Sequence, residues 1–205
     1  MQPHAIFLVK RFALLCVIEK VWKISGRRIQ KKISRRMRNL IIVGTDEFSL
    51  MIFHKLKKTG NYNIIAFSEE RSRIRFNKIE GLPNVPFEDL EYKAPSEVVL
   101  LLIAMNGTES KELRDRLYNS AKAKGYHFLT YISPNANVID TNAIGENTIV
   151  LSGSAIEQNV RIGSNCIIEQ GVHIEQNSVI HDYDIIRSGV RIVEGSNIPE
   201  NSVIG

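Results

Sequence analysis

The chain has 205 residues, 43% of them hydrophobic, with 13 Gly and 6 Pro. This composition excludes a disordered protein, and the length predicts two small domains rather than one large domain. The formal charge of +5 is unevenly distributed, because residues 1–38 carry eleven Lys or Arg and the single acid Glu19, which leaves 16 basic and 21 acidic residues in 39–205. The acidic balance of this larger part argues against a nucleic-acid-binding protein.

The cysteines further narrow the class of protein. Cys16 and Cys166 are the only two, and neither belongs to a C-x-x-C motif or to a cysteine–histidine cluster with metal-ligand spacing. A disulfide framework and a structural zinc site are therefore not expected, and no other metal site is indicated. The pattern favours a reducing compartment, the cytoplasm.

Residues 1–38 predict a basic amphipathic helix or arm. The apolar run 5–18 contains Lys10 and Arg11, has no small-residue cleavage site and is too short to cross a bilayer unaided, so neither a signal peptide nor a transmembrane span is indicated. Ile18, Trp22, Ile29 and Ile33 then recur near helical spacing among basic residues. Two interpretations remain open: peripheral contact of residues 5–37 with the anionic inner face of the membrane, or packing on the protein itself or on a partner.

Residues 39–132 alternate between strand-like and helical patterns, as a small Rossmann-like α/β domain would. Uniformly apolar strands are typical of a parallel sheet that is covered on both faces, and ligands of such a sheet bind at the carboxyl ends of its strands. The expected strands are 39–44, 62–67, 98–103 and 127–132, and the expected helices are about 48–58 and 110–124.

The turn after the first predicted strand differs from a phosphate-binding turn. It contains one glycine, Gly44, and two acids, Asp46 and Glu47, where a phosphate would need neutral or positive surroundings. This argues against tight nucleotide binding by the turn itself. The two acids suit the capped first turn of a helix, which is the structural interpretation we favour over a ligand-binding one.

A β-branched aliphatic residue occupies every sixth position from Val138 to Ile204. A period of six predicts a left-handed parallel β-helix over 133–205, in which three hexads form one coil and each aliphatic side chain points to the axis. An 18-residue stacking period then places the twelve residues on three faces: Val138, Ile156, Ile174 and Ile192; Ile144, Ile162, Ile180 and Ile198; Val150, Ile168, Ile186 and Ile204. The fold class is thus α/β followed by all-β.

This order of domains, joined through the linker 131–136 with Pro134, resembles the bacterial sugar acetyltransferases of the sialic-acid O-acetyltransferase and bacillosamine N-acetyltransferase group. The resemblance covers about 39–205, and its more specific parts are the strand 40–44, the segment 103–107 followed by Arg114, and the stretch 162–168. It implies a homotrimer that binds a nucleotide sugar through the first domain, with Gly44 and Asn106 as candidate contacts, and acetyl-CoA between adjacent β-helices. The implied activity is acetylation of a sugar for a surface polysaccharide or glycan.

The chain departs from the family pattern at the general base. The family motif has a His followed by an acid at the positions that are Gln176 and Asn177 here, and its second His aligns with Ile185. An amide cannot take up a proton at neutral pH. The substitute candidates are His173 and His181, and the alternative for each is a solvated surface residue. Cys166 occupies an inward slot and is interpreted as a small core residue, not a nucleophile.

The chain also stops at Gly205, where family members continue into further coils and a tail that helps to hold coenzyme A, so we expect either a truncated gene or a partner chain over that end. Three hypotheses remain: an acetyl-CoA-dependent sugar acetyltransferase, a catalytically inactive trimeric scaffold or regulatory subunit that associates with the membrane through its arm, and a nucleotide-sugar-binding protein without acyl transfer. Fold alone does not decide between them.

Overall fold

The computed structural model describes residues 38–106 and 110–205. Asn39–Gly205 form one compact unit. The interpretations of the basic arm, including membrane contact through residues 5–37, lie outside the described residues. No helix within the described ranges is long and apolar enough to cross a membrane.

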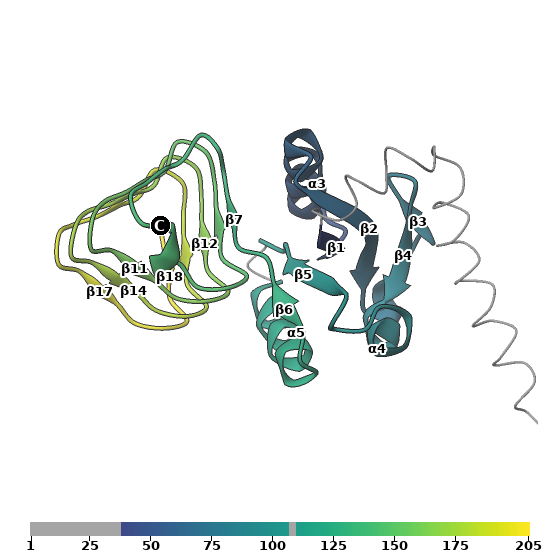
Figure 1. The fold of residues 1–205 in the computed structure, drawn as a ribbon. Helices are drawn as coiled ribbons and strands as arrows, with labels where there is room; N and C mark the ends of the chain where they lie inside the picture. Colours follow the sequence, from purple (N-terminus) through teal and green to yellow (C-terminus); the bar gives the residue numbers. More distant parts are fainter. Residues whose placement is uncertain (1–37, 107–109) are drawn as a thin grey trace, which may run out of the picture. The chain divides into compact units, whose positions relative to one another are not determined.

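The first half of this unit is built on a six-stranded sheet (Figure 1) with the order β3-β4-β2-β1-β5-β6. β5 pairs in parallel with both β1 and β6, β2 pairs in parallel with β4, and β3 runs antiparallel to β4. Its strands are β1 (Arg38–Val43), β2 (Tyr62–Glu69), β3 (Lys78–Ile79), β4 (Leu82–Pro86), β5 (Val99–Ile103) and β6 (His127–Phe128).

Both faces of the sheet are covered, as the uniformly apolar strands predict. Helix α3 (Glu47–Thr59) packs in one hydrophobic cluster with Leu40, Ile42 and Leu102, whereas α5 (Lys111–Ala123) packs in another with Ile41 and Leu101. Successive residues of a strand point to opposite faces, so a buried strand needs apolar side chains at every position. Over 38–106 and 110–205 the other helices are α4 (Leu90–Lys93) and the 3-10 turns Arg71–Arg73, Phe87–Asp89 and Thr141–Ala143.

Two features of this half differ from the sequence prediction. The expected closing strand 127–132 is wrong as a single element, because β6 pairs with β5 whereas β7 (Tyr131–Ile132) pairs with β9 of the β-helix. Between them Leu129 N donates to Leu101 O, and Thr130 Oγ1 donates to Gly145 O, so the chain changes sheets at this point. The pair β3 and β4 was not predicted, because two prolines in 82–86 obscure the strand pattern.

The second half is a parallel β-helix with three faces, and the predicted 18-residue register is confirmed. The first face has the order β16-β13-β10-β8, the second β11-β14-β17, and the third β18-β15-β12-β9-β7, with parallel pairings such as Ile156 with Ile174 and Ile168 with Ile186. Its strands are β8 (Asn137–Val138), β9 (Ile149–Val150), β10 (Ala155–Ile156), β11 (Arg161–Ile162), β12 (Ile167–Ile168), β13 (His173–Ile174), β14 (Val179–Ile180), β15 (Ile185–Ile186), β16 (Arg191–Ile192), β17 (Asn197–Ile198) and β18 (Val203–Ile204).

The turns between faces fall in columns because the coil repeats. Three corners carry residues in the left-handed region of the backbone, among them Gly171, Asn165 and Asn177, whose φ angles are 69°, 56° and 61°. Glycine and asparagine adopt this region at the lowest cost. These residues allow the chain to turn between short strands in every coil.

The third face packs against the α/β half. Outward residues Ile149 and Leu151 join the hydrophobic cluster of β1 and α3. Three consecutive hydrogen bonds fix the orientation of this contact. Ile103 N donates to Asn147 Oδ1 over 2.8 Å, Asn147 Nδ2 donates to Asn165 Oδ1 over 2.7 Å, and Asn165 Nδ2 donates to Asp115 Oδ1 over 2.7 Å. Asn147 and Asn165 are buried, so each hydrogen bond also satisfies a group that water cannot reach.

Candidate functional site

A cleft of about 680 Å³ opens at the carboxyl ends of β1, β2 and β5. The residues after β1 (Thr45, Asp46), after β5 (Met105) and at the start of α5 (Ser110) line it together with the segment after β2. From β1 the chain first adds β2, β4 and β3 on one side and then β5 and β6 on the other side. The strand order therefore reverses between β1 and β5. Ligands of open α/β sheets bind at such points, and the cleft has the size of a small-molecule site.

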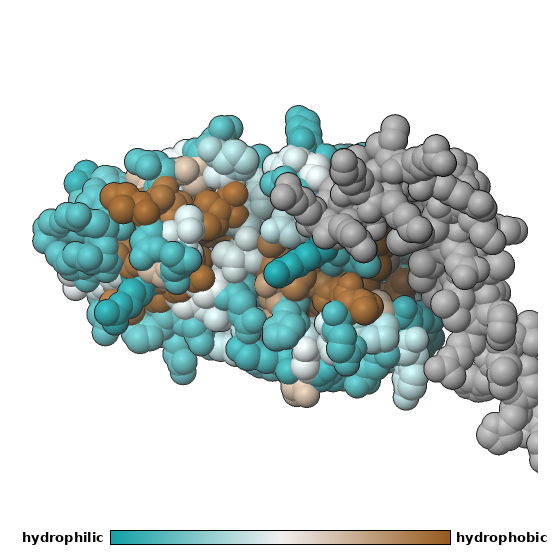
Figure 2. Space-filling model, in the orientation of Figure 1, coloured by the Kyte–Doolittle hydropathy of each residue, from teal (hydrophilic) through white to brown (hydrophobic). Residues whose placement is uncertain are grey.

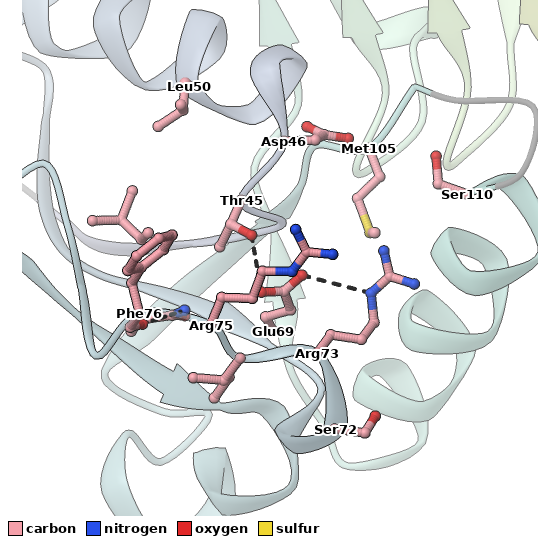
Figure 3. Close-up of a pocket in the computed structure, with 13 residues that line it drawn as sticks. Thr45, Asp46, Leu50, Glu69, Ser72, Arg73, Arg75, Phe76, Met105 and Ser110 are labelled. Carbon is pink, nitrogen blue, oxygen red and sulfur yellow. Dashed lines mark hydrogen bonds and ion pairs between the residues drawn. The ribbon is translucent and has the colours of Figure 1, made fainter.

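The cleft carries two arginines around one carboxylate. Glu69 Oε2 accepts from Thr45 Oγ1 over 2.9 Å, and Glu69 Oε1 lies 3.5 Å from Arg73 Nε. Figure 3 shows the side chains of Arg73 and Arg75 converging on Glu69, and Arg75 has no hydrogen bond or ion pair with any residue of 38–106 or 110–205. Phe76 stands beside them with 66% of its surface exposed. A spare guanidinium next to an exposed aromatic ring suits a ligand with an anionic and a planar part.

The turn after β1 has the capping role that its acids predict. Asp46 is the N-cap of α3, and its Oδ1 accepts from Ser49 N over 2.8 Å and from Ser49 Oγ over 2.9 Å. Gly44 has a φ of 119°, and a Cβ there would lie 2.9 Å from Ala104 O. Gly44 is thus required for close packing of β1 against β5, and its neighbour Thr45 lines the cleft instead.

Asn106, the other candidate substrate contact, faces the β-helix. Its Nδ2 donates to Glu169 Oε1 over 2.9 Å, and Arg187 Nη1 lies 2.8 Å from the same oxygen. Burial acts to raise the pKa of Glu169, but hydrogen bonds from Asn106, Arg187 and Ser188 outweigh it and hold this pKa below its usual range. Gly44 and Asn106 thus remain predictions as substrate contacts, and neither belongs to the cleft lining.

Arg114 lies one turn into α5 and is almost completely buried. Its Nε is 3.4 Å from Asp115 Oδ1, while Nη1 and Nη2 have no hydrogen-bond partner among the described residues. Burial lowers the pKa of Arg114, and Asp115 acts against this shift. The guanidinium is therefore held by its packing at the junction more than by specific pairing.

The family base position on the β-helix is occupied by a ladder of amides. Gln176 Oε1 accepts from Gln158 Nε2 over 3.2 Å, and Gln176 Nε2 donates to Glu194 Oε1 over 3.0 Å. Asn177 Oδ1 accepts from Asn159 Nδ2 over 3.1 Å. These side chains connect the turns of three neighbouring coils. They stabilise the corner and provide no group that can take up a proton at neutral pH.

His173, one of the two substitute candidates, pairs with a carboxylate that was not predicted. His173 Nε2 lies 2.7 Å from Glu157 Oε1, and Glu157 Oε2 accepts from Gln176 N over 3.1 Å. The structure therefore brings together His173, Glu157 and the family base position on the first face. The stacking register already places residue 155 opposite 173, so Glu157 could have been found as its diagonal neighbour.

His181 has a neutral partner instead. Its Nε2 lies 2.9 Å from Asn197 Oδ1 on the second face, and the nearby Asp182 uses its Oδ1 to accept from Ser164 N over 2.7 Å. No carboxylate of the described residues holds the ring of His181 in an ion pair or hydrogen bond. The two candidate histidines thus differ in the group that orients them.

Two inward residues next to each other on the third face are ionisable. Cys166 is a free, fully buried thiol whose pKa is raised to about 12 by burial, which agrees with a core role and not with a nucleophile. Asp184, also fully buried, accepts from Ser202 N through Oδ1 over 2.7 Å, and burial raises the pKa of this carboxyl to about 6. Its Oδ2 has no hydrogen-bond partner among the described residues.

Sequence reasoning missed the charged wall of the cleft. Glu69, Arg73, Arg75 and Phe76 follow the predicted strand 62–67 directly, and three arginines between 71 and 75 at the carboxyl end of a strand were a usable signal. Within the described ranges no group of three or more His, Cys, Asp or Glu is placed to hold a metal ion.

The structure thus combines an α/β sheet that carries a ligand-sized cleft with a parallel β-helix built from hexapeptide repeats. Residues 143–176 match the family model described as bacterial transferase hexapeptide (six repeats). No curated protein sequence gives a significant match to the chain. The repeat predicted from every sixth residue is thus confirmed independently of the coordinates.

The particular proteins that share the fold are bacterial. The acetyltransferase domain of PglB from Neisseria gonorrhoeae matches with a TM-score of 0.55 and 18% identity over 81% of this chain and 95% of that chain. A mutant perosamine N-acetyltransferase from Caulobacter crescentus, in complex with CoA and GDP-perosamine, matches with a TM-score of 0.60 and 21% identity. The match covers 80% of this chain and 84% of that chain. WeeI from Acinetobacter baumannii matches with a TM-score of 0.62 and 17% identity over 76% of this chain and 72% of that chain. The predicted resemblance to the sugar acetyltransferases is confirmed at the level of the fold, that of the left-handed hexapeptide β-helix.

Proposed function

We propose that this protein is an acetyl-CoA-dependent acetyltransferase that acts on a nucleotide-linked sugar in surface polysaccharide or glycan biosynthesis. The observation that carries the proposal is the cleft with Arg73, Arg75 and Phe76 at the carboxyl end of a sheet that is joined to a hexapeptide β-helix. In this proposal residues 39–132 are a Rossmann-like domain for the nucleotide sugar, and residues 133–205 form the domain for acetyl transfer.

The chemistry of the cleft fits the nucleotide part of such a substrate. A diphosphate is a divalent anion with several acceptor oxygens, which guanidinium groups bind in a charge-assisted way. The exposed ring of Phe76 offers a stacking surface for the base, and Thr45, Ser72 and Ser110 offer hydroxyl groups for the sugar. The turn after β1 takes no part in phosphate binding, because its acid caps α3 and its glycine packs on Ala104.

The acetyl group would come from acetyl-CoA. The perosamine N-acetyltransferase structure contains CoA and GDP-perosamine, and a second PglB structure contains acetyl coenzyme A. In hexapeptide enzymes of the resembling group, acetyl-CoA lies between adjacent β-helices, so we also propose a homotrimer. The surface of the β-helix supports contact with other copies, because Ile139, Val193 and Val203 are exposed and Figure 2 shows apolar residues gathered over part of this domain.

The inactive-scaffold hypothesis is not favoured, because the similar solved structures include proteins described as acetyltransferases. We propose a cytoplasmic location, and the eleven basic residues of 1–38 support contact of the arm with the inner face of the membrane. Nucleotide-sugar binding without acyl transfer would leave the β-helix without a role in the reaction.

The experiment is thiol release from acetyl-CoA by the purified full chain, measured with a chromogenic thiol reagent and a panel of nucleotide-linked amino and hydroxy sugars. We expect the thiol to be released only when an acceptor sugar is present. Mass spectrometry then identifies the acetylated product. Absence of release with every acceptor, together with no coenzyme A binding in calorimetry, would contradict the proposal. Light scattering tests the trimer, which requires about 70 kDa, three times the 23.2 kDa of one chain.

A further inference from the structure

On the first face of the β-helix, the ring of His173 projects outward next to the inward Ile174. The side chain is 36% exposed, and its partner Glu157 is 39% exposed. The pair is therefore open to a ligand, and it lies one coil apart in the stack because residues 155 and 173 are directly opposite. This arrangement resembles a base with a carboxylate behind it, which is how histidine bases are oriented in many enzymes.

The hydrogen bond determines which ring nitrogen can act. An ionised carboxylate only accepts hydrogen bonds, so Nε2, at 2.7 Å from Glu157 Oε1, carries the hydrogen in the neutral ring. Nδ1 then holds the free lone pair. Nδ1 makes no hydrogen bond to any residue of 38–106 or 110–205. The neutral ring is thus prepared to accept a proton at Nδ1 from a bound substrate.

The carboxylate is itself held in place. Glu157 Oε2 accepts from Gln176 N over 3.1 Å, so both of its oxygens have a partner and the side chain cannot turn away from the histidine. Gln176 is the position at which the resembling enzymes carry their base. Glu157 therefore links the ring of His173 to the corner where acetyl transfer is expected, because it contacts both His173 and the backbone of Gln176.

The other charges around His173 are neutralised or structural. Glu175, two residues after His173 in the same coil, pairs with Arg191 and accepts from Glu194 N over 2.9 Å. Glu157 is the acid that contacts the ring of His173, whereas Glu175 interacts with His173 through space and is paired with Arg191. His181 differs, since an amide oxygen cannot stabilise a protonated ring as a carboxylate does.

We infer that His173 is the general base of acetyl transfer in this protein and that Glu157 is the residue that positions it. The inference rests on the proposed function. The amine or hydroxyl group of the sugar attacks the thioester carbonyl carbon, a new C–N or C–O bond forms, and its proton passes to Nδ1 of His173. The C–S bond then breaks, and the leaving thiolate of coenzyme A takes this proton from the imidazolium, which returns the ring to its neutral form.

The test compares the kinetics of full-length variants with wild type. His173→Gln should lower kcat by roughly 100-fold or more, the usual contribution of a general base, and change the KM for acetyl-CoA much less. Glu157→Gln should lower kcat by roughly 10-fold and alter the pH dependence of kcat, while Glu157→Asp restores part of the rate. His181→Gln is the matched control and should keep the wild-type rate. Circular dichroism melting confirms that each variant is folded.

A rescue separates a chemical role from a structural one. In the His173→Gln background, Gln176→His returns a base to the family position and should recover part of the lost kcat. Nitrogen-15 NMR gives a readout without turnover: the hydrogen of His173 resides on Nε2 in wild type, and this preference should weaken in Glu157→Gln. The inference alone is overturned if wild type turns over and His173→Gln keeps its kcat or wild-type NMR places the hydrogen on Nδ1. If wild type is silent with every acceptor, the proposed function falls as well.

Discussion

The cleft of the α/β half and the first face of the β-helix differ in how their charged side chains are paired. In the cleft, Arg73 and Arg75 lie around the carboxylate of Glu69 while Asp46 caps α3, and Arg75 has no partner among the described residues. On the first face, charges pair across neighbouring coils, His173 with Glu157 and Arg191 with Glu175. The guanidinium of Arg75 is thus available to a ligand of the cleft, whereas the charged side chains of the first face pair with one another.

The difference follows from how each region is built. A coil of the β-helix returns the chain to the same face after 18 residues, so side chains 16 to 18 positions apart meet and can neutralise each other. The segment after β2 has no such repeat: Arg71 pairs with Asp89 and Arg73 with Glu69, but Arg75 is left without a partner among the described residues. Binding of the nucleotide sugar in the cleft should therefore depend on its arginines and on salt concentration. Catalysis on the first face should depend instead on the fixed orientation of its paired side chains.

Removal of the arginines from the cleft gives the largest expected effect. Arg75→Ala should weaken nucleotide-sugar binding by roughly 10-fold, and the double variant Arg73→Ala with Arg75→Ala by roughly 100-fold, because each guanidinium forms charge-assisted hydrogen bonds with phosphate. Titration calorimetry at two salt concentrations measures both the affinity and its salt dependence. Arg71→Ala is the control, because Arg71 pairs with Asp89 and does not line the cleft. Equal affinities in all variants would contradict the assignment of the cleft.

A change at Asp184 tests a carboxylate inside the β-helix whose Oδ2 is left unpaired. The folded state raises its pKa to about 6 and so binds its proton more tightly than the unfolded chain. This contribution to stability is complete below about pH 3.9, the ordinary value, and is lost as the pH rises through about 6. Between pH 4.5 and 7.5 wild type should lose roughly 2 kcal/mol more unfolding free energy than Asp184→Asn.

Urea unfolding of both proteins at the two pH values measures this difference. Asparagine keeps the acceptor for Ser202 N and cannot ionise, so it serves as the matched comparison. Parallel pH profiles of the two proteins would show that the pKa of Asp184 is the same in the folded and unfolded states.

A change at the corner of the first face gives the smallest effect. Asn177 has a φ of 61°, and Gly195 occupies the same corner one coil later with a φ of 70°. Asn177→Ala should lower the unfolding free energy by about 1 kcal/mol more than Asn177→Gly, because alanine is strained in this region and glycine is not. Thermal unfolding compares the two variants, both of which lose the hydrogen bonds of the side chain. An alanine variant as stable as the glycine variant would show that the corner tolerates a Cβ.

The sequence predicted those parts of the fold that depend on local pattern. The register of the β-helix follows from a repeat of six, so Ile156 and Ile174 could be paired before any coordinates. The split of 127–132 between two sheets could not, because Phe128 and Tyr131 are both apolar enough for either. In the candidate site, His173 and His181 were named from the sequence and remain predictions, whereas Glu157 requires the diagonal register and Arg75 lies in an irregular segment.

The hydrogen bonds from Ile103 through Asn147 and Asn165 to Asp115 restrict how this chain can change in evolution. Asn147 and Asn165 are 18 residues apart and must both face the end of β5 and the start of α5. Insertion of one hexad between them would rotate every later residue by one face and separate Asn165 from Asp115. Relatives should therefore gain or lose whole coils, and those changes should occur beyond Asn165, where the α/β domain no longer fixes the phase of the repeat.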